Sequence, residues 1–310
     1  MSDRLSGIAA FVQTVEAGSF ALAAERLGLS RSAVGKSIAR LEERLGVRLF
    51  HRTTRSQSLT EDGQAFYERC ARAVAELKAA EAELDTGQRA PAGILRVSAP
   101  VLFGRHCVAP VLVDLARRHA ALTLDLSFTD RQIDLVEEGI DLGVRIAPLA
   151  DRAGLIARKL GTMRMVVVAA PSYLTARGVP RRLADLAEHD SVVYGRGGGS
   201  KPWTFIGSDG RETEIRVSSR IRFDNLEAIG DAAAAGAGLA FMACWMVADR
   251  LREGALVRVL EDEISAGLDV FAVWPQSRHL PTRVRIAIDE LAARIPGLLE
   301  ADDARSIAFR

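Results

Sequence analysis

The strongest chemical signal in this 310-residue sequence is a cluster of basic side chains near its beginning. Between Arg26 and Arg55 there are eight lysine or arginine residues but only two carboxylates, Glu42 and Glu43. The whole chain, by contrast, has 41 basic and 40 acidic residues and a formal net charge of +1. Long cations and short hydroxyl side chains bind DNA phosphates and base edges. A short basic segment in an otherwise neutral chain therefore predicts a nucleic-acid-binding module.

The apolar residues of this segment predict the helices that would position those side chains. A first amphipathic helix is indicated by residues at spacings of three and four: Leu5, Ile8, Val12 and Val15. A short helix over Phe20–Leu27 ends at Gly28, and Ser30 can cap the third helix. The apolar side of the third helix is formed by Val34, Ile38, Leu41 and Leu45. This order is typical of a helix-turn-helix, whose second helix enters the major groove of DNA.

After Gly46 we expect two short strands with a basic tip, which together form a wing. Arg52 and Arg55 at this tip can contact phosphates or enter the minor groove. The residues expected to bind DNA are Ser30, Arg31, Ser32, Ala33, Lys36, Ser37, Arg40, Arg52, Thr53, Thr54 and Arg55. A helical protein-interaction module with a solvated basic face is the alternative interpretation.

The segment FVQTVEAGSFALAAERLGLSRSAVGKSIARLEERLGVRLFHRTTRSQSLTEDG (residues 11–63) closely resembles the DNA-binding domain of the LysR-type transcriptional regulators. The rest of the chain is compatible with this family over nearly its full length. Gly35 departs from the family pattern, which commonly has a larger polar residue there, and a glycine in a helix costs about 1 kcal/mol relative to alanine. The resemblance implies a winged helix-turn-helix over residues 1–60.

Residues 61–87 predict a linker helix with a heptad seam. The seam residues expected to pair two chains are Phe66, Cys70, Ala73, Leu77, Ala80 and Leu84. A single helix packed on its own domain is the alternative, and the resemblance favours a dimer. Pairing would place two recognition helices on a near-palindromic double-stranded DNA site. The glycine and proline of residues 88–93 predict a hinge.

From residue 94 to 310 the pattern alternates between strands and helices, which predicts a mostly parallel α/β domain in two units. We expect strands at 94–98, 122–128, 142–146, 164–169, 191–194, 203–206, 214–223, 239–243 and 268–274. We expect helices at 103–119, 131–138, 183–188, 226–235, 244–253 and 281–295. The resemblance implies an effector-binding domain with a periplasmic-binding-protein-like fold. Its first subdomain would span about 94–161 and 270–300, and its second about 162–269.

Ligands of α/β sheets bind outside the carboxyl ends of strands, often at helix N-termini. The residues at such ends, expected to bind a small effector, are Ser98, Ala99, Pro100, Val101, Thr129, Asp130, Arg145, Tyr194, Arg196, Trp203, Phe223 and Asn225. A helix cap remains the alternative for Ser98, a structural ion pair for Arg145, and core packing for the aromatic residues. Arg145 and Arg196 favour an anionic or carboxylate ligand.

Other signals exclude competing functions. The glycine-rich stretch 195–201 lacks the spacing of a phosphate-binding loop, and no metal site, cofactor site or catalytic constellation is expected. Three cysteines without close spacing and a polar N-terminus indicate a cytoplasmic protein, and the longest uncharged run, 232–248, is short for a membrane span. We therefore expect a LysR-type regulator and not an enzyme. The resemblance implies a dimer, or a dimer of dimers, with RNA polymerase as a further partner. The alternative is an α/β enzyme or small-molecule carrier with a helical accessory domain.

Overall fold

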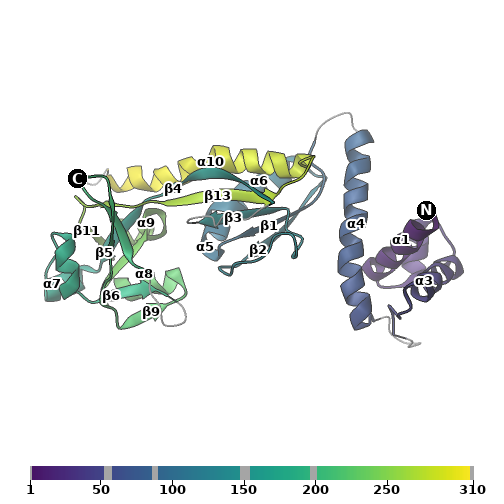
Figure 1. Cartoon of the computed structure of the whole chain (residues 1–310), viewed down its shortest axis with the longest axis horizontal. Helices are drawn as coiled ribbons and strands as arrows, with labels where there is room; N and C mark the ends of the chain where they lie inside the picture. Colours follow the sequence, from purple (N-terminus) through teal and green to yellow (C-terminus); the bar gives the residue numbers. More distant parts are fainter. Residues whose placement is uncertain (1, 52–57, 86–89, 147–153, 196–200, 308–310) are drawn as a thin grey trace. The chain divides into compact units, whose positions relative to one another are not determined.

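The computed structural model divides into two compact units, residues 1–94 and 95–310, and each is described by itself (Figure 1). The structure describes residues 2–51, 58–85, 90–146, 154–195 and 201–307. All observations below concern these residues.

The helices of the first unit are α1 (Ser2–Ala17), α2 (Phe20–Leu27), α3 (Arg31–Leu45) and α4 (Glu61–Asp85). Ser19 and Ser30 cap α2 and α3, because each hydroxyl accepts a hydrogen bond of 3.2 Å from a first-turn amide. Gly28 and Gly46 end the same helices with φ of 63° and 71°, a left-handed conformation that favours glycine. The predicted helix-turn-helix is therefore confirmed, including the residues that begin and end its helices.

A core of aromatic and aliphatic side chains joins these helices. Phe11 of α1 is fully buried, and its ring centroid lies 5.5 Å from that of Phe50 and 5.7 Å from that of Phe66. The buried side of α3 has the predicted spacing and contains Val34, Ile38 and Leu41. Because this stripe faces the core, the polar side of α3 faces outward.

The base of the predicted wing is present. Phe50 and Leu59 form an antiparallel bridge. The amide of His51 donates to the carbonyl of Ser58, and the amide of Thr60 donates to the carbonyl of Leu49, both at 3.0 Å. The tip, residues 52–57, lies outside the described residues.

The described strands of the second unit form three sheets with the orders β2-β1-β3-β13-β4, β11-β5-β10-β6-β9 and β12-β7-β8. The first contains β1 (Gly93–Ala99), β2 (Leu122–Phe128), β3 (Leu142–Ile146), β4 (Leu155–Met163) and β13 (Leu268–Pro275). The second contains β5 (Met165–Ala169), β6 (Ser191–Tyr194), β9 (Ile221–Phe223), β10 (Leu239–Ala243) and β11 (Val257–Val259). The third contains β7 (Trp203–Ile206), β8 (Glu212–Ile215) and β12 (Ile264–Ser265).

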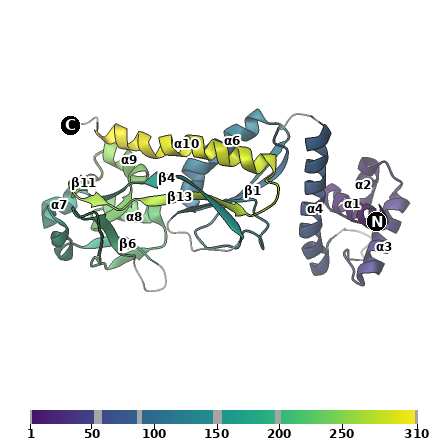
Figure 2. The ribbon, with the colours of Figure 1, turned by 45° about the horizontal axis from the view of Figure 1, so that its top comes forward.

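Helices cover the sheets and bury their apolar faces. They are α5 (Val101–Phe103), a π-helical turn (Gly104–Val108), α6 (Ala109–Arg118), α7 (Pro171–Arg177), a 3₁₀ turn (Leu183–Glu188), α8 (Leu226–Ala234), α9 (Cys244–Arg252) and α10 (Thr282–Ile307). Figure 2 shows α10 lying along β4 and β13. Buried residues of α6 and α10 form one core with the first sheet, whereas the second sheet has separate cores.

Strands β4 and β13 connect the two larger sheets. They pair antiparallel along their whole length, and the chain passes directly from β4 into β5 of the second sheet at Arg164. Asp269 joins them at this crossing, because its carboxylate accepts hydrogen bonds from Lys159 Nζ at 2.6 Å and from Thr162 Oγ1 at 2.7 Å. These two hydrogen bonds hold the pKa of Asp269 below its usual value.

Three predictions about the second unit are wrong. Its sheets are mixed and not mostly parallel, because β13 pairs antiparallel with both of its neighbours and β5 does the same. Residues 131–138 form turns instead of a helix. The carboxylate of Asp134 accepts hydrogen bonds from the amides of Val136 and Glu137 at 2.9 and 3.1 Å, and this local bonding competes with helix formation.

The third difference concerns a strand. The predicted strand 214–223 is divided into β8 and β9, and between them Ser219 donates to the carbonyls of Ser191 and Ile221, both at 2.8 Å. The helix predicted at 183–188 is present with these bounds as a 3₁₀ helix. The sequence also gave no indication of β4, α7, β11 or β12, and α10 continues past Pro296 to Ile307.

Candidate DNA interface and effector site

The recognition face of α3 is exposed and cationic. Lys36 and Arg40 are exposed on the side opposite the buried stripe, and Arg31 is exposed at the first residue of the helix. Ser32 is exposed as well, and its hydroxyl lies 3.1 Å from that of Ser30. Ala33 and Ser37 are half-buried, and Ser30 serves as the helix cap. This arrangement can present cations and hydroxyls to phosphates and base edges.

Two further predictions about the DNA interface concern Gly35 and the tip of the wing. A Cβ added at Gly35 would meet no atom within 4 Å, so packing within the chain does not require glycine there. The predicted wing-tip residues Arg52, Thr53, Thr54 and Arg55 lie outside the described residues.

The predicted dimer seam of α4 falls into two halves. Phe66 and Cys70 pack into the aromatic core of their own unit, and Cys70 is 7% exposed. Burial also raises the pKa of the Cys70 thiol. For these two residues the observed contacts are those of the alternative, a helix packed on its own domain. Ala73 and Leu77, one and two turns later, are exposed. The side chains of Ala80 and Leu84 lie outside the described part of α4.

Residues predicted at the end of β1 do come together. Ser98 and Ala99 are fully buried, and Pro100 leads into α5. The guanidinium of Arg145, on the adjacent strand β3, donates to the hydroxyl of Ser98 at 3.4 and 3.5 Å and to its carbonyl at 3.2 Å. Ser98 is therefore a partner of Arg145 and makes no helix cap, since α5 has no side-chain cap.

The start of α5 already has an acidic partner. The carboxylate of Asp130 accepts a hydrogen bond of 3.1 Å from the amide of Val101. The amide of Thr129 donates to the carbonyl of Ala99 at 2.9 Å, which holds this loop against the end of β1. The amide of Val101, one of the residues expected to bind the effector, thus already donates to a side chain of the same chain.

The residues predicted in the second subdomain are less closely grouped. Tyr194 and Phe223 lie opposite each other on β6 and β9, and both are half-buried. Asn225 caps α8, with its side-chain oxygen 2.9 Å from the amide of Ala228. Trp203 is only 4% exposed and stacks on Phe241 at 5.4 Å, so its role as a cleft residue is corrected to core packing. Arg196 lies outside the described residues.

A contact between the elements that cover the two larger sheets was not predicted from the sequence. Trp245, the second residue of α9, contacts the rings of Phe103 and His106 at 5.9 and 6.0 Å, and its Nε1 donates to the sulfur of Met163 at 3.3 Å. Arg105 lies 3.8 Å from Glu227 of α8. The rule that indicated Ser98 applies equally to Trp245, because α9 begins at the carboxyl end of β10.

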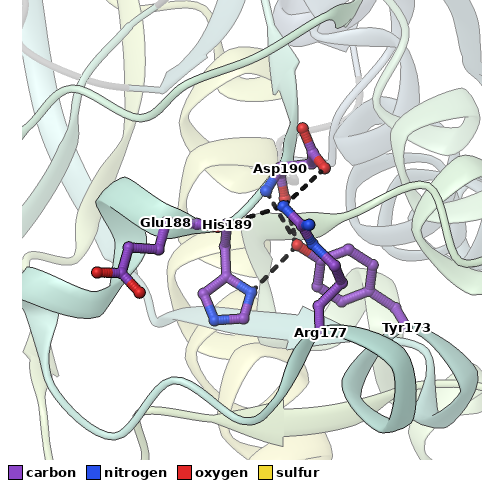
Figure 3. A network of polar contacts seen from close by, with 5 residues as sticks. All are labelled: Tyr173, Arg177, Glu188, His189 and Asp190. Atoms are coloured by element: carbon purple, nitrogen blue, oxygen red, sulfur yellow. Dashed lines mark hydrogen bonds and ion pairs between the residues drawn. The ribbon is translucent and has the colours of Figure 1, made fainter.

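A network of hydrogen bonds near α7 stabilises the fold of the second unit (Figure 3). The hydroxyl of Tyr173 accepts a hydrogen bond from the amide of Asp190 at 2.9 Å and lies 3.1 Å from Nδ1 of His189. Arg177 donates to the carbonyl of Glu188 and the carboxylate of Asp190. Figure 3 shows the Glu188 carboxylate turned away from this group. These contacts hold α7 against the start of β6.

A cavity of about 1080 Å³ lies beside β5 and β11, and its lining includes Arg164, Phe205, Leu256 and Leu260. None of the predicted effector residues lines it. Among the described residues, no group of three or more His, Cys, Asp or Glu side chains is placed to hold a metal ion. No described helix is long and apolar enough to cross a membrane.

Comparison with known proteins assigns both units. Residues 5–64 match the bacterial regulatory helix-turn-helix domain of the lysR family, and residues 88–296 match the LysR substrate binding domain. An HTH-type transcriptional repressor of Pseudomonas aeruginosa is 36% identical over 298 residues, which are 95% of this chain and 94% of the relative. The HTH-type transcriptional activator AaeR of Escherichia coli is 30% identical over 289 residues, 93% of each chain.

Solved structures agree with this assignment. The structure of CrgA, a LysR-type transcriptional regulator from Neisseria meningitidis, is 32% identical, covers 93% of this chain and 97% of its own, and has a TM-score of 0.58. The full-length structure of the Vibrio cholerae virulence activator AphB is 27% identical, covers 93% and 98% of the two chains, and has a TM-score of 0.57. With a helix-turn-helix unit followed by a LysR substrate-binding domain, this chain belongs to the LysR family of transcriptional regulators.

Proposed function

We propose that this regulator binds a near-palindromic, double-stranded DNA site through α3 and the wing of two paired chains. The observation that supports this most directly is the exposed pair Lys36 and Arg40, which lies opposite the buried stripe of the same helix, with Arg31 exposed at its first residue. A recognition helix needs this division, because one side must hold it on its domain while the other contacts DNA. Because the proposed partner is DNA, we also propose that the protein acts in the cytoplasm.

For pairing we propose the exposed second half of α4. Leu77 is 49% exposed and Ala73 is also exposed, which leaves an apolar side without a partner in the described chain. Ala80 and Leu84 continue the same seam in sequence. Two dimers would then form a tetramer, and RNA polymerase would be contacted at the promoter.

For the effector we propose a small molecule that binds beside Ser98 and Arg145. Both residues belong to the first of the two subdomains proposed from the sequence, about 94–161 with 270–300 and about 162–269, and they lie near the carboxyl ends of its strands, where ligands of α/β sheets bind. Arg145 favours an anion, but the Asp130 carboxylate at the amide of Val101 opposes one. An anionic ligand must therefore displace Asp130 or bind on the Arg145 side of it.

DNA binding is tested with purified protein, the DNA upstream of its own gene and a scrambled fragment, at several salt concentrations. We expect preferential binding of the upstream fragment, with log affinity falling linearly with log salt as counterions are released. A well-folded dimer that binds neither fragment would contradict the proposal, and turnover of small molecules would then have to be assayed.

Effector binding is tested by adding small carboxylates and recording the tryptophan fluorescence, to which Trp245, in contact with elements of both larger sheets, contributes together with Trp203 and Trp274. The variant Asp130→Asn removes the charge that opposes an anion while keeping a similar shape. It should bind an anionic effector more tightly than the parent protein. Tighter binding of neutral or cationic compounds only would contradict an anionic ligand.

A further inference from the structure

The base of the wing is held by side chains that the DNA-binding prediction did not include. Glu42 lies on α3 within the recognition segment, yet its side chain is only 10% exposed. One carboxylate oxygen accepts hydrogen bonds from the amides of Leu49 and Phe50 at 2.7 and 3.2 Å. The other accepts from Nη1 of Arg48 at 3.1 Å. A nearly buried carboxylate is thus used entirely to fix the first strand of the wing to the recognition helix.

Thr60 fixes the same strand from its other side. Its hydroxyl donates to the carbonyl of Arg48 at 2.6 Å and accepts from the amide of Gly63 at 2.9 Å. The second of these bonds caps α4, so one side chain joins the wing to the start of the linker helix.

Gly63 permits this close approach. A Cβ at this position would lie 2.1 Å from the carbonyl oxygen of Leu49, far below any real contact distance. Hydrogen bonds and close packing therefore connect α3, the wing base and α4 continuously, through Glu42, Leu49, Thr60 and Gly63.

We propose that Glu42 and Thr60 are positioning residues for DNA recognition, which set the place of the wing relative to α3 and so determine whether both contact DNA together. Neither has to touch DNA. A charge-assisted hydrogen bond to two consecutive amides fixes both the position and the direction of a strand, which a single neutral bond does not. The inference rests on the proposed DNA interface of α3 and the wing.

The test uses variants that change these bonds with little change of shape. Glu42→Gln weakens the acceptor of two amides and Arg48, and Thr60→Val removes the hydroxyl. Glu43→Gln is the matched control. Glu43 is the next residue of α3, is exposed, and has no side-chain hydrogen bond or ion pair among the described residues. Thr60→Ser retains the hydroxyl and should restore binding. Thermal unfolding and dimer mass are measured for every variant before DNA is added.

We expect Glu42→Gln and Thr60→Val to bind the upstream DNA roughly tenfold more weakly, while Thr60→Ser binds as the parent does and Glu43→Gln, which removes the same charge from an exposed position, binds at least as tightly as the parent. The salt dependence should become shallower by about 0.9 for each phosphate contact that the wing loses. Footprints should lose protection at the positions that the wing contacts and keep it at those that α3 contacts.

A double-mutant cycle separates positioning from general loss of structure. If Glu42 acts through the wing, Arg52→Ala should have less effect in the Glu42→Gln protein than in the parent. Lys36→Ala, which alters α3 itself, should have the same effect in both. Effects of Arg52→Ala that are equal in the two backgrounds would overturn the inference. If the parent protein shows no preference for its upstream DNA, the proposed DNA function fails and the inference fails with it.

Discussion

Replacing Lys36 with alanine should separate DNA contact from folding. The Lys36 side chain is exposed on α3 and makes no hydrogen bond or ion pair among the described residues. Alanine has the highest helix propensity, so the substitution should not lower the free energy of unfolding. The control is Lys201→Ala, which removes an exposed lysine from the other unit.

The expected magnitude follows from the kind of contact that Lys36 makes. A dimer has two copies of α3. If each Lys36 contacts a phosphate, the slope of log affinity against log salt should become shallower by roughly 1.8, twice the value of about 0.9 for one phosphate. If each contacts a base edge, the slope should change little, and the preference for the upstream site should fall by about 1–3 kcal/mol per half-site.

The assay is fluorescence anisotropy with labelled upstream and scrambled DNA, between about 50 and 200 mM salt. Each variant is compared with the parent at the same dimer concentration. An unchanged affinity, slope and site preference for Lys36→Ala would refute the assignment of this face of α3 to DNA.

Three further predictions concern the second unit. Ser98→Ala should blunt the effector response and leave DNA affinity intact; Arg145 keeps two carbonyl partners, so urea unfolding should show a loss of only about 1 kcal/mol. Loss of DNA binding would instead indicate a structural role for Ser98. Tyr173→Phe should lower the free energy of unfolding by about 1–3 kcal/mol, because it leaves the amide of Asp190 and a buried histidine without their partner; an unchanged urea midpoint would contradict this. The folded-state pKa of Asp269 is depressed, so its stabilising contribution is complete above the unfolded value of about 3.9 and is lost as pH falls through the lower folded value. Asp269→Asn should remove this part of the acid dependence of unfolding, and an acid limb identical to that of the parent would argue against it.

Local sequence patterns predicted the first unit well because the residues that begin, end and orient its helices lie close to those helices in the sequence. The cap at Ser30, the left-handed glycines Gly28 and Gly46 and the buried stripe of α3 all lie within a few residues of the structure that they specify. Phe66 and Cys70 show where such a pattern stops being informative. A heptad seam states which residues share one side of a helix, but not whether that side faces a second chain or the helix's own domain.

The second unit was predicted less well because strand direction depends on distant partners. The alternation of strands and helices is compatible with a parallel sheet, yet β4 and β13 pair antiparallel across a separation of more than a hundred residues. Strand β4 contains Arg158, Lys159 and Thr162, whose side chains bind partners on β13 and α10, so it lacks the apolar alternation that indicates a strand. The carboxyl-end rule found Ser98, Arg145 and Asp130 because it depends only on where strands end.

The charge count of the recognition segment illustrates what a sequence alone conceals about an interface. Counted along the chain, Glu42 subtracts one charge from the basic cluster and would repel a phosphate. In the folded unit its carboxylate is turned inward, accepts two amides and pairs with Arg48, so little of that negative charge faces solvent. Residues seven and eight positions further along the chain supply those amides, and no local pattern indicates such a contact. Of the two carboxylates in this segment, Glu43 is exposed, whereas Glu42 contributes little negative charge to the exposed side of α3 and instead holds the base of the wing in place.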